Sequence, residues 1–173
     1  GVVVHTSPFL LVHMASAYPR ARGGMQELAG ALTHAGVQAR VLDSEAQVMW
    51  SKLVRLNALA CTTSAYDKLL GEIRSTPALR ADLEGAIEEA CAVGRAEGAR
   101  DVEAATAVAE LDRAHETLGS SMQRDIAAGR EPELDAIAGA VLRAGARHGI
   151  ECPTIARLSE LIARRAGVAA PRV

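Results

Sequence analysis

The change of residue pattern at Ser44 limits the possible folds more than any other feature of this chain. Before Ser44, short apolar runs alternate with turn residues. After it, apolar residues recur every three or four positions, the spacing of amphipathic helices. Gln47 follows Ser44 at the spacing of a capping box, a pattern typical of a helix start. The chain therefore divides into an α/β segment, residues 1–43, and an all-helical segment, residues 44–173.

The pattern of residues 1–43 predicts a small α/β unit. Gly23 and Gly24 are interpreted as a break before a helix that Gly36 ends. Because so few elements cannot cover both faces of a sheet, we expect this segment to be the end of a larger α/β domain. Apolar runs and one helical stripe predict the order strand, strand, helix and strand, at residues 2–5, 9–13, 25–34 and 37–42.

The rest of the chain predicts a bundle of about five or six helices. Only 2% of the residues are aromatic, and Ala and Leu supply most of the apolar bulk, a composition that favours packed helices over a β-sandwich. Pro132 and Pro153 are interpreted as helix starts and Gly149 as a helix end. The first predicted helix begins at Val48 and ends at Leu59 or Tyr66, and the second begins at Leu79 and ends near Gly94 or Gly98. The others cover residues 102–118, 121–129, 132–149 and 153–166.

Composition argues against several classes of protein. A net charge of −2 lacks the positive excess of a nucleic-acid binder, and no apolar run reaches the roughly 18 residues of a membrane helix. Five His and three Cys show no metal-ligand spacing. An odd number of Cys without a CxxC pair favours core thiols in a reducing setting. We therefore expect a cytoplasmic protein with a small-molecule substrate and no metal, nucleic-acid or membrane partner.

Three polar positions on the predicted helices are candidates for chemistry. Lys52 lies within an apolar helix, where it either reaches the surface or lines a cleft. Ser120 and Ser121 lie at a helix start, where their hydroxyls either cap the helix or hold a carboxylate or phosphate. Glu133 precedes the apolar stripe that begins at Leu134, so it either complements the helix dipole or reaches a cleft.

Taken in order, these motifs resemble a known family. They are Trp50-x-Lys52-Leu53, Gly71-Glu72-Ile73, Glu88-Glu89 ahead of Gly94, and the specific stretch SSM..D...GR..E.D.I.G from Ser120 to Gly139. This order is similar to the C-terminal helical domain of the ketopantoate reductases (2-dehydropantoate 2-reductases). Residues 1–43 resemble the end of that family's nucleotide-binding domain. The resemblance implies a mainly α fold, a bundle of the 6-phosphogluconate dehydrogenase C-terminal-like type after a strand–strand–helix–strand remnant.

The resemblance also implies an activity and a set of functional residues. Members are biosynthetic oxidoreductases in which NADPH delivers a hydride to a 2-keto acid bound between two domains. By the same resemblance, Lys52 donates a proton to the developing alkoxide and Glu133 contacts the substrate. Ser121 belongs to the pocket for the substrate's carboxylate and hydroxyl groups. The remaining substrate-binding candidates are Ser120, Asn57 and Thr63.

The sequence departs from the family pattern at two places. The GxGxxG fingerprint of the nucleotide-binding domain is absent, so we expect this chain alone not to bind NADPH as the family does. Two family Asn positions after the lysine fall on Leu56 and Ala60, and Asn57 lies about 100° round the helix from the first of them. These changes favour a larger or more apolar ligand than ketopantoate.

Three functions stay open at this point. The chain is interpreted first as the substrate-binding and dimerisation part of a ketopantoate-reductase-like oxidoreductase. The second hypothesis is a cofactor-independent isomerase, cyclase or lyase that uses the same cleft for acid–base chemistry. The third is a non-catalytic dimerisation module. Under all three we expect a homodimer, because a partial α/β unit leaves apolar surface uncovered, and exchange of the first strands is one way to form it.

Overall fold

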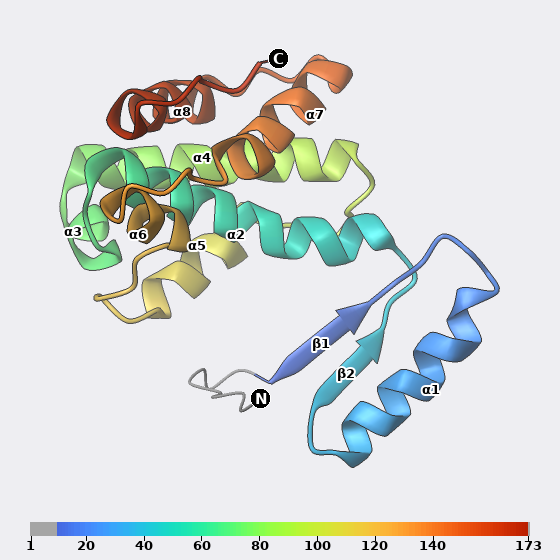
Figure 1. Cartoon of the computed structure of the whole chain (residues 1–173). Coiled ribbons are helices and arrows are strands. Elements are labelled where there is room, and N and C mark those ends of the chain that lie inside the picture. The colour runs from blue at the N-terminus through green and yellow to red at the C-terminus, as the bar shows by residue number, and fades with distance from the viewer. Residues whose placement is uncertain (1–9, 173) are drawn as a thin grey trace. The chain divides into compact units, whose positions relative to one another are not determined.

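The computed structural model describes residues 10–172 and divides the chain into two compact units, residues 1–49 and 50–173 (Figure 1). The described part of the first unit holds two strands and a helix, and the second unit is helical. The predicted fold class, mainly α after a small strand-containing remnant, is confirmed.

The first unit is a parallel β–α–β arrangement. Strand β1 (Leu11–Met14) is followed by helix α1 (Ala21–His34) and strand β2 (Gln38–Val41). The strands pair in parallel with Leu11 opposite Gln38, and Figure 1 shows their arrows pointing the same way. The strand predicted at residues 2–5 lies outside the described residues.

The interpretation of Gly23 and Gly24 as a break before the helix is wrong. Helix α1 begins at Ala21, whose N–H donates to the carbonyl of Tyr18 at 2.9 Å, and both glycines lie inside it. A Cβ added at either position would meet no other atom within 4 Å. Each glycine therefore costs the helix about 1 kcal/mol of intrinsic propensity without preventing it from forming.

The described part of the first unit has no core of its own. Every residue from 10 to 49 is at least partly accessible to solvent. Parallel sheets in known folds are covered on both faces, and here α1 is the helix that connects the two strands. The expectation that residues 1–43 are the end of a larger α/β domain stays a prediction.

The second unit is built around helix α4. Its buried stripe includes Leu83, Ile87 and Cys91, against which α7 and α8 also pack (Figure 1). A Cβ at Gly94 would lie 3.1 Å from the Trp50 indole, so the absence of a side chain lets α2 and α4 approach closely. The helical elements are α2 (Glu45–Tyr66), α3 (Leu70–Ser75), α4 (Pro77–Ala96), α5 (Ala104–Arg113), α6 (Ser121–Ala127), the π-helical turn η1 (Asp135–Gly139), α7 (Ala140–His148) and α8 (Pro153–Ala166).

Local capping signals placed several helix ends correctly. The Ser44 and Ser120 hydroxyls accept the backbone N–H groups of Gln47 and Gln123, each at 3.1 Å, as the capping boxes predict. Gly149 adopts φ +64 after α7 and Pro153 begins α8. These ends depend on residues within a few positions of each other, so the sequence alone indicates them.

Two predicted helices differ from the observed ones at one end. The helix predicted to reach residue 118 ends at Arg113, and the next residues instead pair with the start of α3. The N–H groups of Leu70 and Gly71 donate to the carbonyls of Leu118 and Glu116 at 2.9 and 2.8 Å. The helix predicted to start at Pro132 begins two residues later, at Leu134, and continues into η1.

All three cysteines are buried and unpaired, as predicted for core thiols. Burial raises the pKa of the Cys61 thiol to about 12 and that of Cys152 to about 11. Thiolates are the reactive form, so these thiols are held in their unreactive state.

Among residues 10–172, no helix combines the length and the hydropathy needed to cross a membrane.

Glu89 joins two helices that are far apart in the sequence. Its carboxylate on α4 accepts the backbone N–H groups of Thr154 and Ile155 at 2.7 and 2.9 Å. These groups belong to the first turn of α8, where N–H groups have no partner within the helix. Cys152, the residue before α8, makes no side-chain capping bond, so Glu89 caps the helix from a distance.

We therefore expect Glu89→Ala to lower the free energy of unfolding by about 2 kcal/mol, because two N–H groups lose a charged acceptor. Urea denaturation followed by circular dichroism measures the change. Glu88→Ala is the matched control, since Glu88 is exposed on the same helix and should change stability little. Equal effects of the two variants would contradict the capping role.

A second prediction concerns the thiols. In the native protein, none of the three cysteines should react with a thiol reagent such as DTNB at pH 8, because burial excludes the reagent and raises the thiol pKa. All three should react after unfolding in urea. Rapid labelling of any cysteine under native conditions would show that the surrounding helices open readily.

Candidate functional site

Lys52 lies on α2 with its side chain exposed to solvent. The side chain therefore reaches the surface of the helical unit, and its role in a cleft stays a prediction. Among residues 10–172 it has no ion-pair partner, whereas the other lysine of the chain, Lys68, contacts Glu72 at 2.7 Å. An exposed ammonium group without an internal partner is available to a bound anion.

The two serines at the start of α6 have different surroundings. Ser120 is only 4% exposed and caps α6, whereas Ser121, the first residue of the helix, is exposed. The capping function proposed for this pair on physical grounds therefore belongs to Ser120. The Ser121 hydroxyl is left accessible to a ligand.

Ser120 belongs to a buried hydroxyl cluster, which we define as Thr63, Ser64 and Ser120. The Thr63 hydroxyl lies 2.9 Å from Ser120 Oγ, and Ser64 Oγ lies 3.4 Å from the same atom. Thr63 and Ser64 are both fully buried on α2. The cluster therefore joins the C-terminal part of α2 to the start of α6.

Glu133 lies in the extended segment between α6 and η1, and it is exposed. Its carbonyl accepts the N–H of Ile137 at 3.0 Å, the bond that begins the following helical turn. That turn, η1, has π-helical geometry, which in proteins occurs often beside functional residues. Glu133 thus lies at the N-terminal end of a helix, with its side chain exposed to solvent.

Asn57 is fully buried on α2 rather than lining an open face. Its Oδ1 accepts a weak hydrogen bond from the Cys61 thiol at 3.5 Å. Its Nδ2 is the one buried side-chain polar atom in the described residues that has no hydrogen-bond partner. A buried amide donor without a partner costs stability, so this position carries an energetic penalty.

The structure brings some of the predicted residues together and leaves others apart. Thr63 and Ser120 are in contact, and Ser121 follows directly. Thr63 is three helical turns beyond Lys52, so the Cα atoms of the two are about 16 Å apart along α2. Between them, Leu56 and Leu59 are partly exposed. A ligand that touches both ends therefore lies along an apolar stretch of α2.

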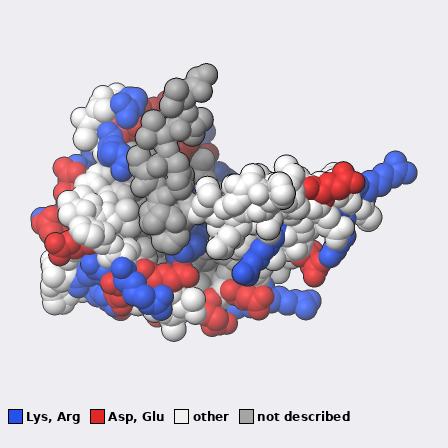
Figure 2. Space-filling view, turned by 90° about the horizontal axis from the view of Figure 1, so that it is seen from below, with Lys and Arg blue, Asp and Glu red and all other residues white. Residues whose placement is uncertain are grey.

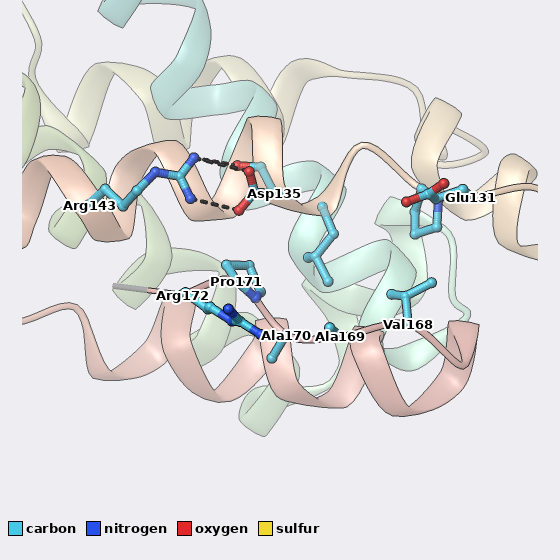
Figure 3. A pocket seen from close by; sticks show the side chains of 10 residues that line it. Glu131, Asp135, Arg143, Val168, Ala169, Ala170, Pro171 and Arg172 are labelled. Atoms are coloured by element: carbon cyan, nitrogen blue, oxygen red, sulfur yellow. Dashed lines mark hydrogen bonds and ion pairs between the residues drawn. The ribbon is translucent and has the colours of Figure 1, made fainter.

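A separate hollow with a volume of about 320 Å³ lies between the segment before η1 and the C-terminal segment (Figure 3). An ion pair closes one side of it, since Arg143 Nη1 lies 2.6 Å from Asp135 Oδ1. In Figure 3 the chain from Val168 to Arg172 runs along the opposite side. Glu133 does not line this hollow, although Glu131 and Asp135 do.

Charges and metal ligands show no further site. Lys and Arg alternate with Asp and Glu over the described residues on the face seen in Figure 2, so that face has no extended basic patch. Within residues 10–172, no group of three His, Cys, Asp or Glu could hold a metal ion. The exposed Lys, Ser and Glu side chains are therefore the candidates for ligand binding.

Solved structures with the same fold define the class of protein. The chain matches D-mandelate dehydrogenase, solved with NADH and anilino(oxo)acetate, with a TM-score of 0.79 and 19% identity over 90% of this chain and 52% of that one. It matches dimeric ketopantoate reductase from Staphylococcus aureus with a TM-score of 0.71 and 18% identity over 90% of this chain and 54% of that one. The chain thus has the fold of about half of each of these proteins.

Sequence comparisons identify the family within this class. The family described as the C-terminal part of ketopantoate reductase (PanE/ApbA) matches residues 46–166. The 2-dehydropantoate 2-reductase of Halobacterium salinarum is 30% identical over 139 residues, which cover 78% of this chain and 45% of that protein. The chain belongs to the ketopantoate reductase family, and its helical unit corresponds to the family's C-terminal domain. It spans about half the length of the curated relatives it matches.

Most residues that support the candidate site could not be recognised from the sequence alone. Ser64 carries no motif of its own, and its place in the hydroxyl cluster follows from the packing of α6 against α2. The same holds for Asp67, which accepts a hydrogen bond from the Gln123 side chain at 3.2 Å. Only the capping box at Ser120 offered a local signal.

The unpartnered amide of Asn57 leads to a stability prediction. We expect Asn57→Leu, a substitution of similar shape, to raise the free energy of unfolding by about 1 kcal/mol, because it removes a buried donor without a partner. Thermal or urea unfolding measures the change. Ser159→Ala is the control, since its buried hydroxyl donates to the Ile155 carbonyl at 2.7 Å and its loss should destabilise. A strongly destabilised Asn57→Leu protein would show that Nδ2 has a partner.

Proposed function

We propose that this chain is the substrate-binding part of an oxidoreductase that acts on a 2-oxo acid with an apolar side chain. The observation that carries the proposal is the exposed, unpaired ammonium group of Lys52 at one end of an apolar stretch of α2, with the Ser121 hydroxyl beyond its other end. Membership of the ketopantoate reductase family supports the reaction class.

The proposed roles follow from the chemistry of each side chain. Lys52 attracts the acid and donates a proton from Nζ to its carbonyl oxygen as electrons reach the C2 carbon. Ser121 and Glu133 bind polar groups of the substrate. Leu56 and Leu59, which are partly exposed, contact its apolar part. Leu56 also stands at one of the two family positions where an amide would bind a small hydroxylated acid. The related fold of D-mandelate dehydrogenase, solved with anilino(oxo)acetate, supports a ligand of this kind.

The described residues do not fit the phosphates of a nicotinamide cofactor. The connection between β1 and α1, residues 15–20, contains Pro19 and no glycine, and Gly23 and Gly24 lie within α1. Such a connection lacks the close backbone approach that a pyrophosphate needs. Reduction of the acid therefore requires a hydride donor bound outside the described residues, and no step through a cofactor is derived.

The same observation favours a second candidate function. Without a hydride donor, Lys52 and Glu133 could still move protons at carbon next to a carbonyl group, as in enolisation or isomerisation. Turnover in buffer free of nucleotide distinguishes this candidate from the reductase. A strictly NADPH-dependent loss of 2-oxo acid would favour the reductase.

We further propose that the protein forms a homodimer and acts in the cytoplasm. The related ketopantoate reductase of Staphylococcus aureus is dimeric, and the described part of the first unit lacks buried residues that would form its own core. Exchange of strands between copies is one arrangement that would cover its sheet. Sedimentation equilibrium tests the dimer, and a monomer at all concentrations would contradict it.

The central test is binding of 2-oxo acids to the Lys52→Met variant. We expect anilino(oxo)acetate and 2-dehydropantoate to bind the wild-type chain, the former more tightly, and the variant to bind about tenfold to a hundredfold more weakly because a charge-assisted hydrogen bond is lost. Isothermal titration calorimetry measures the affinities. Lys68→Met is the matched control, since Lys68 pairs with Glu72 and should not contact the acid. Unchanged affinity in Lys52→Met would overturn the proposal.

A further inference from the structure

The hydroxyl cluster of Thr63, Ser64 and Ser120 is the most completely bonded polar group in the candidate site. We propose that Thr63 and Ser120 are positioning residues, which orient Ser121 toward the ligand without touching the ligand themselves. The inference rests on the proposed function, because it assumes that Ser121 contacts a bound acid. It assigns different roles to residues that the sequence grouped together as substrate contacts.

Burial gives the first argument. Thr63 is fully buried and Ser120 is 4% exposed, so neither hydroxyl reaches a ligand on the surface of the helical unit. Ser121 is the next residue and is exposed. A contact at Ser121 combined with support at Ser120 therefore agrees with the geometry, whereas direct contact through all three hydroxyls does not.

The hydrogen-bonding capacity of Ser120 gives the second argument. Its oxygen accepts the Gln123 N–H at 3.1 Å and lies within hydrogen-bond distance of the Thr63 and Ser64 hydroxyls. A serine hydroxyl has one proton and two lone pairs, so three partners use its whole capacity. The capping group of α6 is therefore engaged by groups of the protein itself, most closely by Gln123 and Thr63.

A second link holds the same turn of α6 in place. The Gln123 side chain donates from Nε2 to Asp67 Oδ1 at 3.2 Å, and Arg165 on α8 lies 2.9 Å from Asp67 Oδ2. Asp67 itself adopts φ +52 just after α2 ends. The first turn of α6 is thus attached to the end of α2 at two points, which holds the backbone of Ser121 in place.

Thr62 provides a natural comparison within the same helix. It is as fully buried as Thr63, and each hydroxyl donates to a carbonyl of its own helix, Thr62 to Ala58 at 2.8 Å and Thr63 to Leu59 at 2.7 Å. Of the two, only Thr63 also contacts Ser120 on α6. Valine has nearly the same shape as threonine, so either Thr→Val substitution removes one buried hydroxyl with little change in volume. Only Thr63→Val removes a bond between α2 and α6, so the pair separates the loss of a buried hydroxyl from the loss of positioning.

The test measures binding of anilino(oxo)acetate by calorimetry in Thr63→Val, Thr62→Val, Ser120→Ala, Ser120→Thr and Ser121→Ala. We expect about tenfold weaker binding in Ser121→Ala and about fivefold weaker binding in Thr63→Val and Ser120→Ala, corresponding to the loss of one hydrogen bond. Ser120→Thr should restore binding, because threonine also caps helices. Thr62→Val should bind as the wild type does. The Ser121 amide resonance of the free protein should shift in Thr63→Val and stay in place in Thr62→Val.

The outcomes distinguish this inference from the proposed function. Equal affinities in Thr63→Val and Thr62→Val, with weaker binding in Ser121→Ala, would overturn the positioning role and leave the proposed function intact. Wild-type affinity in both Ser121→Ala and Lys52→Met would overturn the proposed function and this inference with it. Where Ser120→Ala fails to fold, Thr63→Val and Ser120→Thr still decide between the roles.

Discussion

The helical unit depends on supplying partners for the polar ends of its short helices. Helix α6 has seven residues and α8 fourteen, so the unpaired groups of their first turns are a large share of their backbone. Ser120 satisfies one such group in α6, and Glu89 reaches from α4 to satisfy two in α8. At the end of α5, the Arg74 guanidinium donates to three carbonyls. Because Glu89 and Arg74 belong to other helices, and Ser120 also contacts Thr63 on α2, capping also fixes how the helices are arranged.

The candidate site uses the same device. Ser120 closes the end of α6 and at the same time joins α6 to α2, the helix that carries Lys52. In the proposed arrangement, the hydrogen bonds of the buried Ser120 hold the neighbouring, exposed Ser121 in position. Asn57 differs from this cluster, because its buried Nδ2 has no hydrogen-bond partner in the described residues. Burying this amide costs free energy, which the packing around it must offset. The site thus combines one fully satisfied polar cluster with one unsatisfied amide.

The roles of some residues could be predicted from the sequence because their hydrogen-bond partners lie within one helical turn. The capping boxes at Ser44 and Ser120 predicted two helix starts, and the motif stretch from Ser120 to Gly139 indicated the family that the comparisons confirm. The functional roles of Lys52, Ser121 and Glu133 remain predictions, although all three are exposed as a ligand contact requires. The break predicted at Gly23 failed because local propensity is a weak preference that the surrounding helix overrides.

By itself the sequence determined the mainly helical class, the main helix starts and the family, since each follows from local spacing or a short motif. Only the tertiary structure decided that Thr63 and Ser120 meet and that Asn57 is buried. It also ended α5 at Arg113, where the chain turns to pair with the start of α3. The physical reason is that these contacts join positions tens of residues apart. Their energies depend on how whole helices pack, and no pattern within a single helix records them.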